Sequence, residues 1–325
     1  MKVTVVATVL NTADHVDGFL ASMRAQTRAP DEIVIADGGS TDGTLEALRA
    51  ADGIMLIEAP GANIARGRNL AIAAATHDVI AVADADCAYV PGWLGALLAP
   101  IEDGADVAMG WTDPVVGSFY EACLTSVNLP VSPDEIDPDS FMPSARAVAF
   151  RRDAIEVIGG YPEWLAIGED MWVNHRWRER RLDMRFAPEA VARWRVRPTL
   201  GATWIQYMRY ARGDAHAGMH PERHALRFAV YGGLILALRS ERALPKLLAL
   251  VGAIAYARTP VRRAWRRLAS SRERVLATTV VPALLAFTDI AKIAGYASGL
   301  LDLLRGGGAA RGHAATPPPA DDGQS

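Results

Sequence analysis

The stretch Val79-Ile-Ala-Val-Ala-Asp84-Ala-Asp86 decides the fold class, because an apolar run of strand length ends abruptly in two carboxylates. Side chains two residues apart in a strand point to the same face, so Asp84 and Asp86 could share one hard divalent cation. Short apolar runs are typical of buried parallel strands, and α/β proteins bind ligands at the carboxyl ends of such strands. The motif favours a metal site open to substrate phosphates; for the tripeptide alone, a solvated turn is the alternative.

Strand-like and helix-like segments alternate through the first 110 residues. The alternation predicts an α/β fold with a mainly parallel, doubly wound sheet. Later segments are less regular and contain several prolines. The expected strands are 3–10, 32–36, 54–58, 79–83, 106–111 and 145–150, and the expected helices are 13–26, a segment capped by Ser40 or Thr41 and ending at Arg49, 64–75, 92–101, 119–127, 153–158 and 170–181.

Charge is divided unevenly along the chain. Residues 1–170 carry 9 Lys and Arg against 26 Asp and Glu, a net charge of −17, and residues 171–325 carry 25 against 11, a net charge of +14. The acidic front half argues against a nucleic-acid partner, and the basic, apolar back half predicts contact with an anionic membrane surface. A solvated basic face is the alternative. The two cysteines exclude a disulfide framework and suit a reducing compartment.

The back half contains three apolar stretches, 228–238, 247–257 and 275–287, the last of which continues through 290–304. The first two are too short to cross a bilayer, and the third could do so only by burying Asp289 and Lys292. The basic segment 258–267 contains Trp265 and suits the headgroup layer on the cytoplasmic side of a membrane. We therefore expect a helical, membrane-associated region over 221–305 at the cytoplasmic face of the cell membrane, with a soluble helical subdomain as the alternative. Residues 306–325 have the composition of a disordered tail.

Candidate binding residues follow the other strands. Asp37 begins the small-residue loop DGGSTDGT, where an acid could accept hydrogen bonds from a base or a ribose and where unpaired helix N–H groups are available. The arginines of Ala65-Arg-Gly-Arg-Asn69 could pair with a diphosphate. Glu169-Asp170 opens a helix after a glycine-bounded loop, which makes it a candidate general base. Ordinary turns, solvated helix charges and helix capping are the simpler alternatives.

The segment Gln206–His216 concentrates cations behind these motifs. Arg209 and Arg212 are about one helical turn apart and could face one anion. His216 could complete a metal site with Asp86, although a lone histidine is more often structural.

Taken in order, DGGSTDGT, ARGRN, ADADC, GGYPEWLAIGED and QYMRYARG resemble the motifs of family 2 glycosyltransferases. The resemblance covers about residues 3–215 and implies the GT-A nucleotide-sugar-binding fold, with a catalytic domain over 1–220 and inverting chemistry. It implies that Asp37 contacts the nucleoside, that Asp84 and Asp86 bind Mg²⁺ or Mn²⁺ with the diphosphate, Asp86 more directly, and that Asp170 is the catalytic base.

Two departures from the family pattern limit what the resemblance implies. Processive members carry Gln-x-x-Arg-Trp, whereas this chain ends the motif with Tyr210, so the resemblance does not extend to polymer synthesis. Many members begin with Pro-x-Tyr-Asn where this chain has Thr8-Val-Leu-Asn11, so the resemblance does not imply the contacts of that loop. Together the residue patterns and the resemblance give a nucleotide-sugar set of Asn11, Asp37, Gly39, Arg66, Asn69, Asp84, Glu169, Arg209 and Arg212, and a metal set of Asp84, Asp86 and His216.

The activity implied is metal-dependent, inverting transfer of a sugar from a nucleotide diphosphate-sugar to an acceptor hydroxyl. A membrane-associated back half is compatible with a lipid-linked or envelope-associated acceptor. The alternative is a catalytically inactive, membrane-associated scaffold that retains the fold, against which the intact Asp84, Asp86 and Asp170 argue. A dehydrogenase is disfavoured because the first strand is not followed by G-x-G-x-x-G.

Overall fold

The computed structural model describes residues 1–306, in which one mixed sheet carries the N-terminal half of the chain. Its strand order is β3-β2-β1-β4-β7-β6-β8-β5. The first four strands in this order are mutually parallel, β7 is antiparallel to both of its neighbours, β6 and β8 are parallel, and β5 is antiparallel to β8. The strands are β1 (Val3–Val9), β2 (Glu32–Asp37), β3 (Met55–Glu58), β4 (Val79–Asp84), β5 (Cys87–Tyr89), β6 (Val107–Val115), β7 (Val148–Arg151) and β8 (Met184–Arg195).

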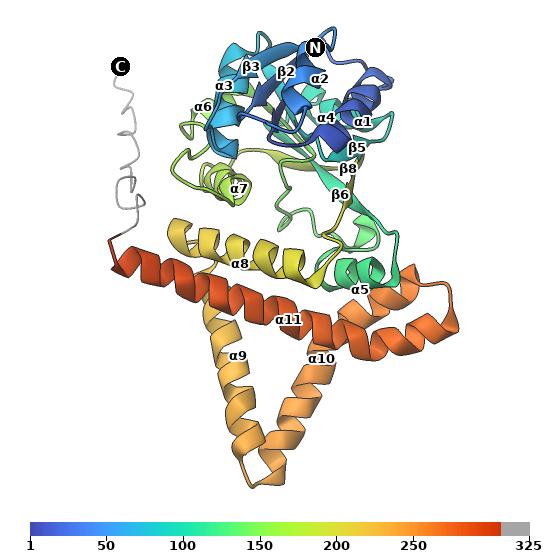
Figure 1. Ribbon diagram of the computed structural model, residues 1–325, viewed down its shortest axis with the longest axis vertical. Helices are drawn as coiled ribbons and strands as arrows, with labels where there is room; N and C mark the ends of the chain where they lie inside the picture. Colours follow the sequence, from blue (N-terminus) through green and yellow to red (C-terminus); the bar gives the residue numbers. More distant parts are fainter. Residues whose placement is uncertain (307–325) are drawn as a thin grey trace.

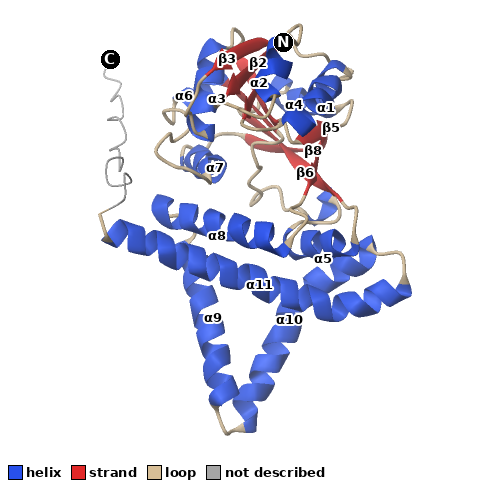
Figure 2. Ribbon diagram, viewed as in Figure 1, coloured by secondary structure: helices blue, strands red, loops and turns tan. Residues whose placement is uncertain are grey.

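Helices cover both faces of the sheet (Figure 2). Alternate residues of β1 enter two separate cores: Val5 packs with Phe19 and Trp93 on one face, and Val6 packs with Ile72 and Trp177 on the other. This alternation follows from the two-residue period of a strand, and it makes the sheet doubly wound. The helices of this half are α1 (Ala13–Arg24), α2 (Thr44–Arg49), α3 (Ile64–Ala74), α4 (Trp93–Glu102), α5 (Phe119–Asn128), α6 (Arg152–Glu156) and α7 (Glu169–Glu179), with a 3₁₀ turn at Pro133–Glu135.

The expected α/β class with a doubly wound sheet is confirmed, and one local expectation needs correction. Neither Ser40 nor Thr41 caps α2, which begins at Thr44 behind a left-handed Gly43. The sequence patterns do not predict β5 or β8. β8 escapes notice because charged residues and Pro188 interrupt its alternation, and its pairing with β6 contains a register shift between Met109 and Trp111.

Four helices follow the sheet: α8 (Leu200–Ala217), α9 (Pro221–Arg239), α10 (Ala243–Arg267) and α11 (Ser271–Leu304). In Figure 1, α8 and α11 lie side by side beneath the sheet, and α9 and α10 extend away from it as a V-shaped hairpin. Close packing of α11 on α8 requires glycine at two positions. A Cβ on Gly295 would lie 2.0 Å from the carbonyl oxygen of Met208, and a Cβ on Gly299 would lie 2.7 Å from the Cβ of Ala215.

Within residues 1–306, α11 is the one helix that is long and apolar enough to cross a membrane, by length and composition only. It packs against α8 and contains the buried Asp289, and 39% of its apolar window is buried inside the protein. The α9–α10 hairpin is different, because it exposes large apolar side chains along both helices. The exposed apolar side chains of the hairpin include Phe228, Val230, Ile235, Leu236, Leu238, Leu247, Leu248, Leu250, Val251 and Ile254.

The predicted disordered tail, residues 306–325, lies outside the described residues except for Gly306.

Candidate active site

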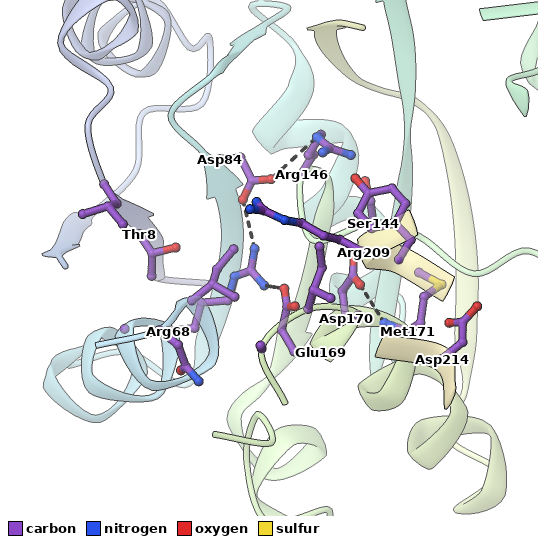
Figure 3. Close-up of a pocket in the computed structure, with 18 of the residues that line it drawn as sticks. Thr8, Arg68, Asp84, Ser144, Arg146, Glu169, Asp170, Met171, Arg209 and Asp214 are labelled. Atoms are coloured by element: carbon purple, nitrogen blue, oxygen red, sulfur yellow. Dashed lines mark hydrogen bonds and ion pairs between the residues drawn. The ribbon is translucent and has the colours of Figure 1, made fainter. Parts of the chain in front are cut away.

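A cavity of about 910 Å³ lies between the carboxyl ends of the parallel strands and the helices α8, α9 and α11. Figure 3 shows residues from far-separated segments converging on it, among them Thr8, Asp84, Asp170 and Arg209. Parallel strands deliver their C-terminal residues to one edge of the sheet, so the topology explains why β1, β2 and β4 all contribute. The site is therefore built where ligands of open α/β sheets usually bind.

Asp37 ends β2 and lines the cavity. Its Oδ1 accepts the backbone N–H groups of Gly39 and Ser40, both at 2.8 Å. Its Oδ2 is buried and lacks a hydrogen-bond partner among the described residues. Buried acceptors are nearly always satisfied, so this oxygen is suited to an N–H or O–H group of a ligand.

Asn11 and Gly39 shape the loop after Asp37. Asn11 adopts a positive φ of 52°, its N–H donates to Ser40 Oγ at 2.9 Å, and its Oδ1 accepts the Thr41 N–H at 2.9 Å. Gly39 has a φ of 101° and would bring a Cβ to 3.2 Å from Pro60. Both residues lie outside the cavity lining and hold the loop against the end of β1.

Two arginines surround Asp84, the buried Arg68 and the half-buried Arg146. Arg68 is one of the two ARGRN arginines expected to pair with a diphosphate, but the predicted site residues include only Arg66 of that pair, and Arg146 was not predicted. Arg68 Nη2 lies 3.0 Å from Asp84 Oδ1, and its Nη1 donates to Glu169. Arg146 Nε lies 3.6 Å from Asp84 Oδ2, and its guanidinium stacks 4.4 Å from the Trp194 ring centroid. Arg68 thus links the end of β4 to the residue that opens α7, and both arginines place positive charge beside Asp84.

The sequence contained a signal for Arg68 but none for Arg146. In α3, Ala65, Arg68 and Ile72 recur at helical spacing on the buried face, whereas Arg66 is exposed. Helical periodicity would therefore have chosen Arg68 over Arg66. The antiparallel register that pairs Val82 with Val148 brings Arg146 opposite Asp84, but that pairing was not expected from a mainly parallel sheet.

Asp84 and Asp86 differ in what they face. Asp84 lines the cavity, whereas the half-buried Asp86 accepts the Trp194 indole N–H at 3.1 Å. No group of three His, Cys, Asp or Glu side chains in residues 1–306 forms a metal cage. Mg²⁺ is ordinarily held by one or two carboxylates together with substrate phosphates and water. Asp84 fits that role in the cavity, whereas Asp86 follows the end of β4 in a turn, lies outside the cavity lining and has its Oδ2 bound by Trp194.

Asp170 is the second residue of α7 and lines the cavity. Its Oδ1 accepts the Met171 N–H at 2.8 Å, and its Oδ2 lies 3.4 Å from the Ala145 N–H. Burial, followed by the neighbouring Glu169 carboxylate, raises the pKa of Asp170 to about 6, against the opposing charges of Arg68 and Arg146. A carboxylate with this pKa is ionised at neutral pH and is a stronger base than an ordinary aspartate.

Asn69 anchors the loop that precedes Asp170. Its Nδ2 donates to the Tyr161 carbonyl at 2.9 Å, and its Oδ1 accepts the Tyr161 N–H at 2.8 Å. Gly160, at a φ of 84°, lets the loop approach this amide. Asn69 therefore contacts the 160–163 loop and is not part of the cavity lining.

The remaining predicted residues divide into two groups. Arg209 lines the cavity, and Figure 3 shows it reaching toward Asp84. Arg66 is exposed outside the cavity. Arg212 Nε and His216 Nε2 both contact Asp302 Oδ2, at 2.7 and 3.1 Å. The structure therefore does not bring His216 to Asp86, because α8 turns this face toward α11.

Comparison with known proteins agrees with this geometry. Residues 4–159 match the model of glycosyl transferase family 2. A pre-mycofactocin glycosyltransferase of Mycobacterium tuberculosis is 30% identical over 249 residues, which are 72% of this chain and 51% of that protein. The chain thus spans about half the length of this relative.

Two solved structures share the fold at low identity. One is a mannosyltransferase from Pyrobaculum calidifontis in complex with GDP-Man and Mn²⁺, with a TM-score of 0.54, 18% identity and coverage of 93% of this chain and 87% of that one. The other is S. aureus TarS 1–349 in complex with UDP, with a TM-score of 0.52, 16% identity and coverage of 94% and 92%. Residues 4–159 thus belong to glycosyltransferase family 2, and the chain has the GT-A fold.

Proposed function

We propose that the protein transfers a sugar from a nucleotide diphosphate-sugar to an acceptor hydroxyl with inversion at the anomeric carbon. The observation that carries the proposal is the meeting of Asp37, Asp84 and Asp170 in one cavity. Asp37 ends β2 and can serve the nucleoside, and Asp84 ends β4 and can serve the diphosphate. Asp170, in the first turn of α7, can serve the acceptor. The relatives named above are consistent with such a donor, since two of them were solved with UDP or GDP-Man.

On the donor side, the unpaired Oδ2 of Asp37 accepts a hydrogen bond from the base or the ribose. Arg146 and Arg209 line the same cavity and supply positive charge for the diphosphate. Arginine is suited to this role, because its planar fork matches phosphate oxygens. Asp84 and Asp86 would hold Mg²⁺ or Mn²⁺, and such a cation supplies charge neutralisation for the departing diphosphate.

On the acceptor side, Asp170 acts as general base. The acceptor oxygen forms its bond to the anomeric carbon while the bond from that carbon to the diphosphate oxygen breaks and its electron pair leaves with the nucleoside diphosphate. The acceptor's proton passes to Asp170. One base on one face suffices for a single displacement, so the product has inverted configuration.

The proposal extends to location. We assign residues 1–220 to the catalytic domain and 221–305 to a region associated with the cytoplasmic face of the membrane. The exposed apolar side chains of the α9–α10 hairpin support this assignment. The basic residues at the end of α10 do not, because Arg263 and Arg266 pair with Glu135 and Arg267 donates to the Pro130 carbonyl. An acceptor that is lipid-linked or part of the cell envelope follows from such a location. The inactive-scaffold alternative is not favoured, because the carboxylates and their arginine partners are intact.

Calorimetry with UDP and GDP, with and without Mn²⁺, tests the donor site. We expect metal-dependent binding of one nucleotide and a loss of its metal dependence in Asp86→Ala. Asp113→Ala is the matched control, since Asp113 is a strand carboxylate outside the cavity lining. Binding of equal strength with and without metal, or unchanged behaviour of Asp86→Ala, would count against the metal assignment.

A further inference from the structure

The cavity has a second, cationic end that the donor site does not use. Arg223 and Arg227 of α9 and Lys292 of α11 line it at the root of the α9–α10 hairpin. We infer that this end binds the phosphate of an amphiphilic acceptor that carries the reacting hydroxyl. The inference rests on the proposed function and names its acceptor class.

The arrangement of α9 directs this charge into the cavity. His220, the N-cap of α9, lines the cavity together with Arg223, His224 and Arg227; Arg227 lies four residues after Arg223 and three after His224. Residues so spaced share one face of a helix, so the first two turns of α9 form one wall of the site. Past Arg227 the same helix exposes Phe228, Val230 and Ile235. The cationic wall is therefore continuous with the apolar hairpin.

The nearby carboxylates do not neutralise this wall. Asp214 is the one carboxylate of the cavity lining at this end, and it contacts His224 Nε2 at 2.9 Å. The buried Asp289 is shared, because it lies 3.2 Å from Arg227 Nε and 3.9 Å from Lys292 Nζ. Arg223 has no ion-pair partner among the described residues. Three cations thus face Asp289 and Asp214, of which the latter already pairs with His224.

The position of these cations assigns them to the acceptor. Arg146 and Arg209 serve the donor's diphosphate beside Asp84, where Figure 3 shows Arg209. Arg223, Arg227 and Lys292 come from the hairpin root, next to the proposed membrane surface. A phosphate bound there, with its alkyl chain along the exposed apolar side chains of α9, leaves the rest of the cavity for the hydroxyl-bearing head that reaches Asp170.

The phosphate is not itself the nucleophile in this assignment. A phosphate monoester is already ionised at neutral pH and needs no general base, whereas a hydroxyl does. The retained carboxylate at Asp170 therefore points to a hydroxyl acceptor whose phosphate serves as a handle. The chemical class is a lipid phosphate or diphosphate bearing a sugar or polyol.

Calorimetry on the detergent-solubilised full chain tests the inference with hexyl phosphate as the probe. Saturation with Mn²⁺ and whichever of UDP or GDP binds keeps the donor site filled. We expect hexyl phosphate to bind the wild-type protein, and to bind about tenfold more weakly in Arg223→Gln and Lys292→Gln. Arg223→Lys should restore part of the affinity. Arg242→Gln, at the far end of the hairpin, is the control and should bind as the wild type does.

Each other outcome overturns the inference. Equal binding by all variants would place the phosphate elsewhere, and no binding would remove the phosphate site. Inorganic phosphate binding as tightly as hexyl phosphate would show a site for free phosphate without an alkyl chain. Arg223 is exposed, so its variant remains informative if Lys292→Gln fails to fold. Failure of the wild type to bind either nucleotide would instead contradict the proposed donor site.

Discussion

Arg68 Nη2 lies 3.0 Å from Asp84 Oδ1, which ties the middle of the ARGRN helix to the end of the central strand. Arg68 is 1% exposed and also donates to Glu169, so it neutralises two carboxylates in a site largely closed to water. Removing one member of such a buried network leaves the others uncompensated. The pairing therefore makes the fold and the donor site depend on the same side chain.

Arg68→Gln is expected to lower the free energy of unfolding by about 3–5 kcal/mol, because Asp84 and Glu169 lose their shared cation. Urea unfolding followed by circular dichroism measures the change. Arg66→Gln, two residues away on the exposed side of the same helix, should change stability by less than about 0.5 kcal/mol. Equal losses in the two variants would contradict the structural role of Arg68.

Asp170→Asn is expected to lower kcat by about 10²–10⁴-fold, because the amide cannot take the acceptor's proton. Nucleotide affinity should stay at the wild-type value, since the base does not touch the nucleoside. Steady-state kinetics and calorimetry on the same preparation separate the two effects. Asp153→Asn in α6 is a control outside the cavity. A variant with wild-type turnover would rule out Asp170 as the base.

The pH dependence of kcat/KM should report the raised pKa of Asp170. Burial and Glu169 raise that pKa to about 6 from the ordinary 3.8. A base must be deprotonated, so the rate should be constant well above pH 6 and fall about tenfold per unit below it. A profile that stays flat down to pH 5 would mean that the base has an ordinary pKa or is another group.

Gly299→Val is expected to destabilise the packing of α11 on α8. A Cβ there would meet the Arg212 carbonyl oxygen at 2.8 Å, and helix backbone cannot move aside as a side chain can. Overpacking of this kind costs about 1–3 kcal/mol, measurable as a lower melting temperature. Gly252→Val in α10 is the matched control, because a Cβ at that position would meet nothing within 4 Å. Similar melting temperatures for the two variants would argue that α11 is not fixed to α8.

Vesicle flotation tests the proposed membrane contact of the hairpin. The full chain should float with vesicles containing anionic lipid, and Leu248→Glu with Val251→Glu should abolish flotation, because both exposed side chains would bury charge in lipid. Val115→Glu, on the sheet domain, is the control at a comparably exposed apolar residue. Flotation of the double variant at the wild-type level would place the membrane contact elsewhere, or make the hairpin an interface between protein chains.

The parallel half of the sheet could be predicted from sequence because its strands are short runs separated from one another by helices. The strand that ends in Asp84 is the clearest case. The second half could not, because β8 mixes charged and apolar residues and pairs across long sequence separations with β5 and β6. Local patterns contain little information about such pairings.

The candidate site also contains residues that local sequence patterns predict and residues that depend on the tertiary fold. Asp37, Asp84 and Asp170 were identified because acids at strand ends and helix starts stand out in a sequence. Arg66 was chosen over Arg68, and Arg146 was missed, because the importance of Arg68 and Arg146 comes from packing against Asp84, which depends on the tertiary fold. Arg212 and His216 were selected by spacing within α8, but their face of the helix turns to Asp302 in α11.

Nucleoside diphosphate release from a panel of UDP-, GDP- and TDP-sugars, with and without Mn²⁺, tests the central claim most directly when wild type and Asp170→Asn are compared. The account predicts metal-dependent release from one donor by the wild-type protein and its loss in Asp170→Asn. Release that is independent of metal, or that proceeds equally in the variant, would contradict it.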